Sequence, residues 1–313
     1  MPTYLANLAT DFRSFAVRVV RALPNIRGRG RIAAVVNRLL LSAGADPVVI
    51  CEMRDYRLRL DCRIFSHCHA YFSGGDGGSE ISALMSFLRP GGTALDVGAN
   101  IGLYAIPMAL EAKRHGARLV AVEPVAPNLA WLAHNLALNG CADDTTILPV
   151  GLGDHFGEVE IVLAEDFLTG ARIGNAVIAD KTMYDERFRR VLIRLDTLDR
   201  IWLNVGGRLD VVKVDIEGYE SKFLEGGRAT IAAHRPVFLM EVNRWFYQKR
   251  GLDFDSLIPA LLPNDYVFGE LRSTGRIERI ENPARCRASD IFMAPIERVR
   301  GDQRSAINAW ASF

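Results

Sequence analysis

The sequence lacks the features that would place it in several broad classes of protein. Lysine plus arginine (38) balances aspartate plus glutamate (37), so no overall charge favours a nucleic-acid partner. No apolar run approaches the ~20 residues that a helix needs to cross a bilayer. The five cysteines are odd in number and form no Cys-x-x-Cys pair, which argues against a disulfide framework and favours a reducing, cytoplasmic location. With 49% hydrophobic residues among 313, the chain has enough apolar side chains for an ample core.

Acidic residues are absent from residues 12–45, although seven arginines occur there. Apolar residues recur at helical spacing on both sides of a Pro-Asn-Ile-Arg-Gly break, which predicts two short amphipathic helices in a basic extension of residues 1–45. We expect a helical cap whose apolar stripe packs on the main domain. Contact with an anionic membrane surface or an acidic partner is an alternative. A transit peptide is another, although Ser and Thr are not enriched. The recurring residues are Phe12, Phe15, Ala16, Val19, Leu23, Ile32, Val35, Val36, Leu39 and Leu40.

Residues 46–80 are interpreted as short strands followed by a glycine-rich connection. Apolar and polar residues alternate as far as Phe72. Cysteine and histidine gather in this stretch in a spacing that matches no zinc-binding pattern, so we interpret them as one face of a strand. The glycine cluster at 74–78 lacks the Gly-Lys-Ser/Thr of a phosphate loop, which favours a mobile connection. The cysteine and histidine residues are Cys62, His67, Cys68 and His69.

Strands and helices alternate from Arg89 onward. Because the strands are rich in Val, Ile and Leu, we predict an α/β fold with a parallel sheet covered on both faces. The last segments, from Tyr266 to Ala294, are typical of antiparallel strands that close one edge. The predicted strands are 93–97, 117–123, 145–152, 209–216 and 236–242, and the predicted helices are 101–115, 126–140 and 220–233.

The first predicted strand ends at an acid beside a glycine turn. In such sheets, ligands bind beyond the carboxyl ends of the strands. A dinucleotide fold would show Gly-x-Gly-x-x-Gly there, but this turn has only Gly98 and Gly102 and is preceded by Asp96. A carboxylate would repel a pyrophosphate and attract an ammonium group. S-adenosylmethionine, a nucleoside with a cationic amino-acid tail, therefore fits better than a dinucleotide.

Two further acids follow the next two strands. Glu123 is placed to accept hydrogen bonds from both ribose hydroxyls, although NAD enzymes also have an acid there. Asp154 is placed to accept from the adenine amino group. Each acid could instead cap the following helix. Three acids at successive strand ends favour the cofactor interpretation.

These segments resemble the FkbM-type methyltransferases, a class I S-adenosylmethionine family. The resemblance spans residues 81–295 and rests on DVGANIGLY, AVEPVAPNLAWLAHNLALNG, RLDTLD, VVKVDIEGYESKFLEGG and PVFLMEVN in this order. It implies a Rossmann-like class I methyltransferase sheet over residues 81–297, mostly parallel with an antiparallel edge, followed by a tail at 298–313. It also implies O-methylation of hydroxyls, often on sugars, glycans or secondary metabolites. The implied cofactor-binding residues are Asp96, Gly98, Asn100, Gly102 and Glu123.

Transfer to an unactivated hydroxyl benefits from a base or from a metal that acidifies the hydroxyl. Lys213, Asp215 and Glu217 alternate along the fourth strand, and Glu241 ends its neighbour, which makes all four catalytic candidates. Alternatively, Lys213 and Asp215 form a structural ion pair. The negative charges of Glu217 and Glu220 would then stabilise the N-terminus of the following helix. Clustered carboxylates could also hold a magnesium ion, but no metal ligand is assigned.

Rival reactions lack their sequence signatures. After the fourth strand there is no Asn/Asp-Pro-Pro-aromatic loop of the kind that methylates base amines, and no Pro-Cys nucleophile. We therefore expect an O-methyltransferase whose acceptor is a small molecule or glycan and not a nucleic acid. The insertion between Asp154 and Leu195 either shapes the acceptor pocket or is a surface excursion. A dinucleotide oxidoreductase with an atypical glycine loop and a non-catalytic cofactor-binding module are the alternatives. Oligomeric state is not indicated.

Overall fold

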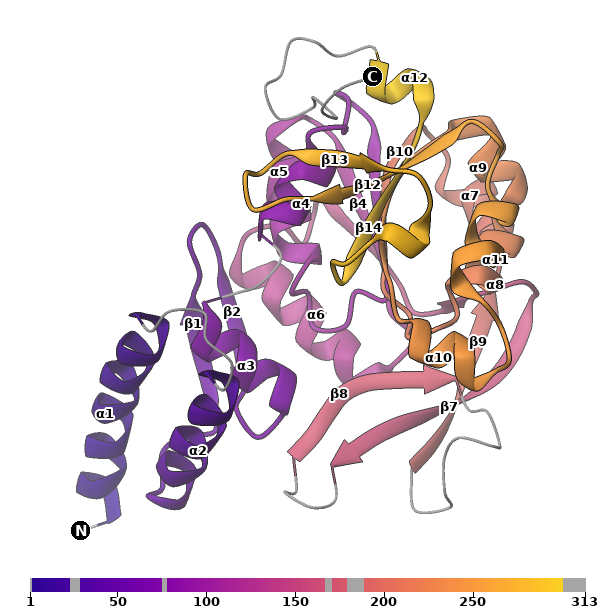
Figure 1. Ribbon diagram of the computed structural model, residues 1–313. Helices are drawn as coiled ribbons and strands as arrows, with labels where there is room; N and C mark the ends of the chain where they lie inside the picture. The colour runs from indigo at the N-terminus through magenta and orange to yellow at the C-terminus, as the bar shows by residue number, and fades with distance from the viewer. Residues whose placement is uncertain (1, 23–28, 75–77, 167–170, 179–188, 301–313) are drawn as a thin grey trace. The chain divides into compact units, whose positions relative to one another are not determined.

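The protein consists of two compact units, which are described separately (Figure 1). The first comprises residues 1–76 and 163–175, and the second comprises residues 77–162 and 176–313. The computed structural model describes residues 2–22, 29–74, 78–166, 171–178 and 189–300. No helix in these ranges combines the length and the hydropathy that spanning a bilayer requires. All five cysteines are buried and free.

The N-terminal unit packs three helices with a β-hairpin. Helix α1 contacts both α2 and α3, and β1 pairs with β2 in antiparallel orientation. The two predicted amphipathic helices and the predicted strands are therefore present. The elements are α1 (Pro2–Ala22), α2 (Arg29–Ser42), β1 (Val48–Glu52), β2 (Arg57–Asp61) and α3 (Phe65–Ser73).

The strand interpretation is wrong for all four residues: Cys62 lies in the turn after β2, and the histidines and Cys68 lie on helix α3. The chain turns after β2, where the Asp61 carboxylate accepts from the backbone N–H of Arg63. His67 is buried and its Nδ1 accepts from the backbone N–H of Asp61 at 3.1 Å. Burial lowers the pKa of His67 to about 4, so this ring is a neutral core side chain. Gly74 ends α3 with φ 86°, a conformation that glycine adopts readily, and residues 75–77 of the glycine cluster lie outside the described residues.

The buried face of α1 and α2 includes only two residues of the predicted apolar stripe, Ala16 and Leu40, and the packing of the stripe on the main domain stays a prediction. Among the side chains of residues 12–22 and 30–42, the buried apolar ones are Ala16, Val17 and Val20 on α1 and Ala33 and Leu40 on α2. Six of the ten stripe residues are exposed, and Leu23 lies outside the described residues. The exposed six are Phe12, Phe15, Val19, Ile32, Val35 and Leu39.

The second unit is built on an eight-stranded sheet in the order β13-β12-β14-β11-β10-β3-β4-β5. Strands β11, β10, β3, β4 and β5 are parallel, and β14, β12 and β13 extend the sheet in antiparallel orientation. The predicted parallel sheet and antiparallel edge are confirmed. These strands are β3 (Thr93–Val97), β4 (Arg118–Val122), β5 (Thr145–Leu148), β10 (Leu209–Val214), β11 (Val237–Glu241), β12 (Tyr266–Leu271), β13 (Ile277–Ile280) and β14 (Asp290–Pro295).

A second sheet has the order β6-β9-β7-β8 and contains most of the insertion. Its strands are β6 (Gly151–Leu152), β7 (Gly157–Asp166), β8 (Ala171–Ile178) and β9 (Arg189–Asp196). The side chains of residues 164–189 lie outside the described ones, so a role of the insertion in an acceptor pocket stays a prediction.

Helices flank the large sheet on both sides (Figure 1). The helix predicted over residues 220–233 is two helices, which separate near Gly226 and Gly227. A Cβ at Gly226 would lie 1.9 Å from the carbonyl oxygen of Gly153, so this approach requires glycine. The helices are α4 (Gly78–Met85), α5 (Ala105–Arg114), α6 (Ala126–Leu138), α7 (Leu198–Val205), α8 (Glu220–Gly226), α9 (Arg228–His234), α10 (Arg244–Lys249), α11 (Phe254–Leu261), the 3₁₀ turn η1 (Pro283–Arg285) and α12 (Ile296–Arg300).

Both faces of the parallel strands bury apolar side chains, but one face also buries charged ones. On one face, side chains such as Leu95, Val97 and Val212 form a continuous apolar core with α7 to α11. Because successive side chains of a strand alternate between faces, Asp96 and Lys213 belong to the other face, and both are buried. The register places Asp96 directly beside Lys213. The face of Asp96 and Lys213 therefore carries charge toward the carboxyl edge of the sheet.

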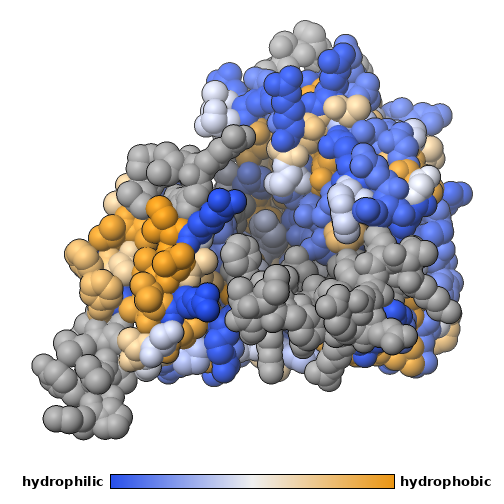
Figure 2. Space-filling model, turned by 60° about the horizontal axis from the view of Figure 1, so that its bottom comes forward, coloured by the Kyte–Doolittle hydropathy of each residue, from blue (hydrophilic) through white to orange (hydrophobic). Residues whose placement is uncertain are grey.

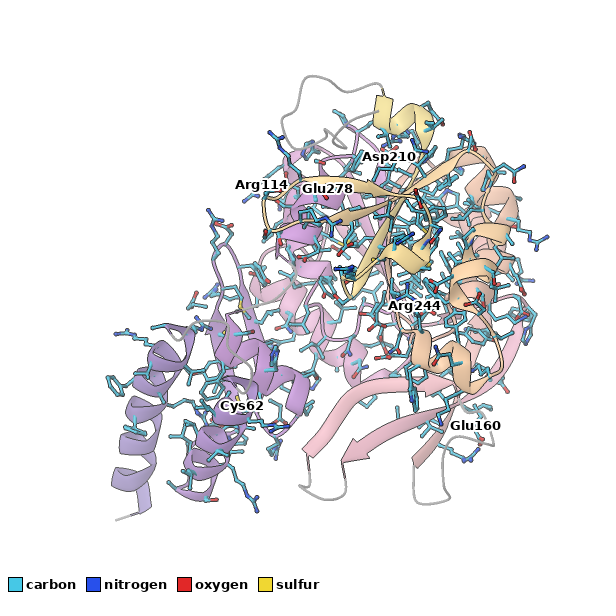
Figure 3. The ribbon with its side chains drawn as sticks, in the orientation of Figure 1. Cys62, Arg114, Glu160, Asp210, Arg244 and Glu278 are labelled. Atoms are coloured by element: carbon cyan, nitrogen blue, oxygen red, sulfur yellow. The ribbon has the colours of Figure 1, made fainter. Side chains whose placement is uncertain are left out.

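A buried carboxylate, Asp210, lies at the N-terminal end of β10, which is the end away from the charged carboxyl edge (Figure 3). The Asp210 side chain is fully buried, and its Oδ1 accepts from Nε of Arg89 at 2.8 Å and from Nε of Arg208 at 3.0 Å. Nη1 of Arg298 lies 3.5 Å from the same oxygen. Burial opposes the charge of Asp210, but the hydrogen bonds from Arg89 and Arg208 lower its pKa below the usual value. Three arginines from separate segments thus converge on one carboxylate.

Candidate active site

The tight turn that follows β3 is hydrogen-bonded to the end of β4. The backbone N–H groups of Gly98 and Ala99 both donate to the carbonyl oxygen of Val122, at 3.0 and 2.9 Å. Gly98 has φ 87°, and a Cβ there would lie 2.0 Å from the carbonyl oxygen of Asp215. Any side chain at Gly98 would therefore separate the ends of β3 and β10. Asn100 also has positive φ, at 50°, which asparagine tolerates better than most residues.

Glu123 ties this turn to the start of α6. Its Oε2 accepts from the backbone N–H of Asn100 at 2.9 Å, and its Oε1 accepts from the N–H of Val125 and from Nδ2 of Asn128, at 2.9 and 3.1 Å. Burial raises the pKa of Glu123 although these three hydrogen bonds oppose the rise. An ionised carboxylate accepts about four hydrogen bonds. One acceptor position therefore remains, so binding both ribose hydroxyls would require Glu123 to release one of its present donors.

Asp96 is a buried carboxylate with an unsatisfied oxygen. It is 1% exposed, and its Oδ2 has no hydrogen-bond partner among the described residues. Burial and the negative charges of Asp215 and Glu123 raise its pKa to about 7, although Lys213 opposes the rise. A buried carboxylate without a partner is costly, and a cationic group beside it would remove that cost. Asp96 thus fits the ammonium group that the sequence predicts for this position.

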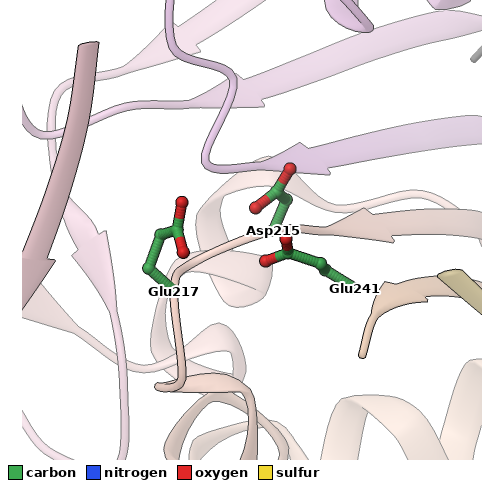
Figure 4. Close-up of side chains that lie close together, drawn as sticks. All are labelled: Asp215, Glu217 and Glu241. Carbon is green, nitrogen blue, oxygen red and sulfur yellow. The ribbon is translucent and has the colours of Figure 1, made fainter. Parts of the chain in front are cut away.

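Three carboxylates meet where β10 and β11 end (Figure 4). One oxygen from each of Asp215, Glu217 and Glu241 lies within 4.8 Å of the others. Strand β10 ends at Val214, so the prediction that Asp215 and Glu217 lie on this strand is wrong for both: Asp215 directly follows the strand, and Glu217 lies two residues further on. Glu217 has φ 53° and turns the chain toward α8, and this turn is what brings its side chain to the cluster.

The cluster carries less negative charge than its composition indicates. Burial, together with the charges of Asp215 and Glu217, raises the pKa of Glu241 to about 10. Glu241 is therefore protonated at neutral pH, and a hydrogen bond with Asp215 favours this state. Burial, again with Asp215, raises the pKa of Glu217 to about 7, while Asn243 donates to its Oε2 at 3.4 Å. The cluster thus combines proton donors and acceptors, and its oxygens could also hold a cation.

Lys213 provides the positive charge beside this cluster. Its Nζ lies 2.9 Å from Oδ1 of Asp290 and 3.7 Å from Oδ2 of Asp215, and 4.9 Å from the centroid of the Tyr104 ring. Burial disfavours its charge, but Asp215 and Asp290 raise its pKa, so Lys213 stays an ammonium. Lys213 therefore orients carboxylates and cannot itself accept a proton.

Sequence reasoning missed Asp290 and Tyr104. Asp290 begins β14, which runs antiparallel to β11 and pairs Asp290 with Glu241. An antiparallel strand begins at the edge where its parallel neighbour ends. An acid at the start of the predicted edge strand was therefore the signal that could have placed Asp290 here. Tyr104 had no comparable signal.

Asp154 pairs with the next residue in the chain and with a lysine on α8. Its Oδ1 lies 2.8 Å from Nδ1 of His155, and its Oδ2 lies 3.0 Å from Nζ of Lys222. Burial opposes the charge of Asp154, but hydrogen bonds from His155 and Lys222 lower its pKa, so it is ionised. Gly102 has φ 97°, and a Cβ there would press on Ile106 and Leu132 at 3.1 Å. For both residues, contact with a cofactor stays a prediction.

Comparison with known proteins gives one family match. The model of the family described as "Methyltransferase FkbM domain" matches residues 96–273, more than half of the chain. The AMB antimetabolite synthetase AmbE of Pseudomonas aeruginosa is 29% identical over 182 residues, which are 49% of this chain and 8% of that protein. The chain thus corresponds to a small part of that relative's length.

Two solved structures are similar at low identity. The methyltransferase FkbM of Methylobacillus flagellatus is 18% identical with a TM-score of 0.44, and the alignment covers 73% of this chain and 53% of that one. The SAM-dependent methyltransferase of Agrobacterium tumefaciens is 11% identical with a TM-score of 0.43, covering 80% and 70%. Neither similarity identifies a substrate.

Proposed function

The chain belongs to the FkbM methyltransferase family, whose members depend on S-adenosylmethionine, and from this premise we propose that it methylates a hydroxyl group. The observation that carries the proposal is the carboxylate cluster of Asp215, Glu217 and Glu241 at the ends of two central strands. Ligands of such sheets bind beyond these strand ends. The cluster therefore lies where an acceptor would meet the cofactor.

The cofactor would be held by the turn after β3 and by the acid that follows β4. Asp96 has the unsatisfied buried oxygen that suits the ammonium group, and Glu123 keeps one acceptor position for a ribose hydroxyl. S-adenosylmethionine supplies a methyl group that its sulfonium already activates. The protein's contribution is then to place the acceptor oxygen in line and to remove its proton.

The carboxylate cluster favours a hydroxyl acceptor over a base amine. Asp215 can accept the hydroxyl proton, and the protonated Glu241 can donate a hydrogen bond that holds the acceptor. Lys213 keeps Asp215 oriented from a buried position. The sequence after β10 offers no Pro-Pro-aromatic loop for a planar base. A sugar, glycan or secondary-metabolite hydroxyl is proposed from the family resemblance, and the five free cysteines support a reducing, cytoplasmic location.

The test combines calorimetry with an acceptor screen. We expect the purified chain to bind S-adenosylhomocysteine and not NADH. Incubated with isotopically labelled S-adenosylmethionine, it should transfer label to sugar or polyol hydroxyls but not to nucleobase amines. Binding of NADH would favour an oxidoreductase. Cofactor binding without transfer to any hydroxyl in a broad panel would favour a non-catalytic module. Transfer to amines alone would contradict the proposed acceptor class.

The raised pKa of Asp96 predicts that cofactor binding depends on pH. An ammonium group binds the ionised carboxylate, so binding must displace the proton that Asp96 holds below its pKa of about 7. Affinity for S-adenosylhomocysteine should rise up to about tenfold from one pH unit below this pKa to one unit above, and then level off. Calorimetry across this range measures the effect. Asp96→Asn should bind weakly with a flat profile, and an unchanged pH dependence in this variant would assign the titration to another group.

A further inference from the structure

The N-terminal unit exposes two apolar stripes on adjacent helices. On α1, Phe12, Phe15 and Val19 are 58%, 61% and 45% exposed, and on α2, Ile32, Val35 and Leu39 are 43%, 60% and 66% exposed. Each set has the spacing i, i+3, i+7, which places its members along one side of a helix. The rings of Phe12 and Phe15 lie 6.2 Å apart. Figure 2 shows hydrophobic side chains gathered on one face of this unit.

These side chains are not needed to build the unit. The opposite sides of both helices already supply its interior, and α2 and α3 pack against each other as well as against α1. Large apolar patches on a protein surface usually mark a site that contacts another protein, a ligand or a membrane. The two stripes therefore require a separate explanation.

The charges around the stripes have one sign. Arg18, Arg31 and Arg38 are exposed, and residues 12–45 contain no acid. Two other arginines point inward: Arg13 is buried and donates to the carbonyl oxygen of Asp46, and Arg21 donates to the carbonyl oxygen of Tyr71 at 2.8 Å. The inward arginines stabilise the unit, whereas the side chains of the outward three are exposed and form no hydrogen bond or ion pair with another described residue. A partner that contacts them should be anionic.

We propose that this face, formed by the six stripe residues and the three outward arginines, binds the surface of an anionic lipid bilayer. On residues 12–22 and 30–42, the parts of the two helices whose side chains the structure describes, the exposed polar side chains other than arginine are Ser14 and Ser42. A protein interface of useful size forms about ten hydrogen bonds and draws on varied polar groups, which this face lacks. Apolar side chains beside arginine are typical of helices that lie in the interfacial layer of a membrane. The binding is peripheral, and the inference does not depend on the methyl-transfer reaction.

Vesicle flotation of the full chain tests the proposal. We expect retention on phosphatidylcholine vesicles that contain phosphatidylglycerol, little retention on phosphatidylcholine alone, and release as salt increases. Phe15→Ser with Leu39→Ser should abolish retention. Replacing Arg18, Arg31 and Arg38 by serine should lower the partition coefficient by about fivefold per arginine, which is the effect of one basic residue near an anionic surface.

A matched control is available in the second unit. Leu203 on α7 is 86% exposed, so Leu203→Ser removes an exposed leucine without touching the proposed face, and retention should be unchanged. Because Phe15 and Leu39 are exposed, their replacement should leave the thermal midpoint of unfolding unchanged, which circular dichroism measures. The arginine variant keeps the test valid if the apolar variant folds poorly.

Three results would overturn the proposal. Equal retention on vesicles with and without phosphatidylglycerol would show that the arginines do not recognise anionic lipid. A lower midpoint for the Phe15 and Leu39 variant, together with no vesicle binding by the unaltered chain, would show that the stripes pack on the methyltransferase unit. A dimer in sedimentation that these substitutions dissociate, again without vesicle binding, would show that a second copy covers this face.

Discussion

Replacing Asp215 with asparagine should lower kcat for methyl transfer by about 10²–10⁴-fold, the usual contribution of a general base, and should leave cofactor affinity largely intact. Asparagine keeps the size of the side chain and removes its ability to accept the hydroxyl proton. Asp215 follows the central strand β10, and its carboxylate lies within reach of Glu217, Glu241 and Lys213. The loss should therefore appear in kcat, measured with an identified acceptor, while calorimetry with S-adenosylhomocysteine shows retained binding.

The matched control is Asp265→Asn, which removes a half-exposed carboxylate that pairs with Arg235 away from the cluster. Its activity should equal that of the unaltered chain. Full activity of Asp215→Asn would exclude Asp215 as base and as metal ligand. Loss of activity on chelation, with recovery on adding magnesium, would select a cation held by the three carboxylates over a simple base. Activity that chelation does not change would select the base.

Replacing Asp210 with alanine should lower the free energy of unfolding by about 3–5 kcal/mol. The substitution leaves Arg89, Arg208 and Arg298 facing one another at the edge of β10 with no carboxylate between them. The loss comes from uncompensated positive charge, because Arg298 is itself largely shielded from solvent and burial already lowers its pKa. Urea unfolding followed by tryptophan fluorescence measures it, since Trp202 is buried in the same unit.

Glu278→Ala is the control for this measurement. Glu278 pairs with Arg272 and is 48% exposed, so its loss should cost about 0–1 kcal/mol. The Asp210 effect should also depend on pH. Burial raises the pKa of Asp210, but the arginines lower it to below the unfolded value of about 4, so its stabilisation is present above that pH and is lost as pH falls further. Equal losses for the two variants would show that the arginine cluster is not a major source of stability.

Local sequence patterns were sufficient to identify the parallel strands and the residues that end them. Runs of Val, Ile and Leu between helical segments predict a sheet with helices on both faces. The alternation of side chains along each strand then assigns each residue to one face. Asp96, Glu123 and Glu241 could therefore be named as strand-end residues before any contact was known. The wrong assignments fall where a turn changes the pattern: at Glu217, where positive φ leaves the strand, and at His67 to His69, where a short helix follows the hairpin. Periodicity over so few residues does not distinguish a strand from a helix.

By itself, the sequence determined the alternating α/β architecture, the family, and the acids at the strand ends, because each depends on residues that are close together in the chain. Only the tertiary structure decided which charges meet. Lys213 pairs with Asp290, 77 residues away, because β14 returns antiparallel beside β11. The protonation of Glu241 likewise depends on burial and on Asp215 beside it, and which side of α1 is buried depends on α2 and α3. Coulombic and packing energies depend on distance in space, and that distance exists only once the strands are paired and the helices are packed.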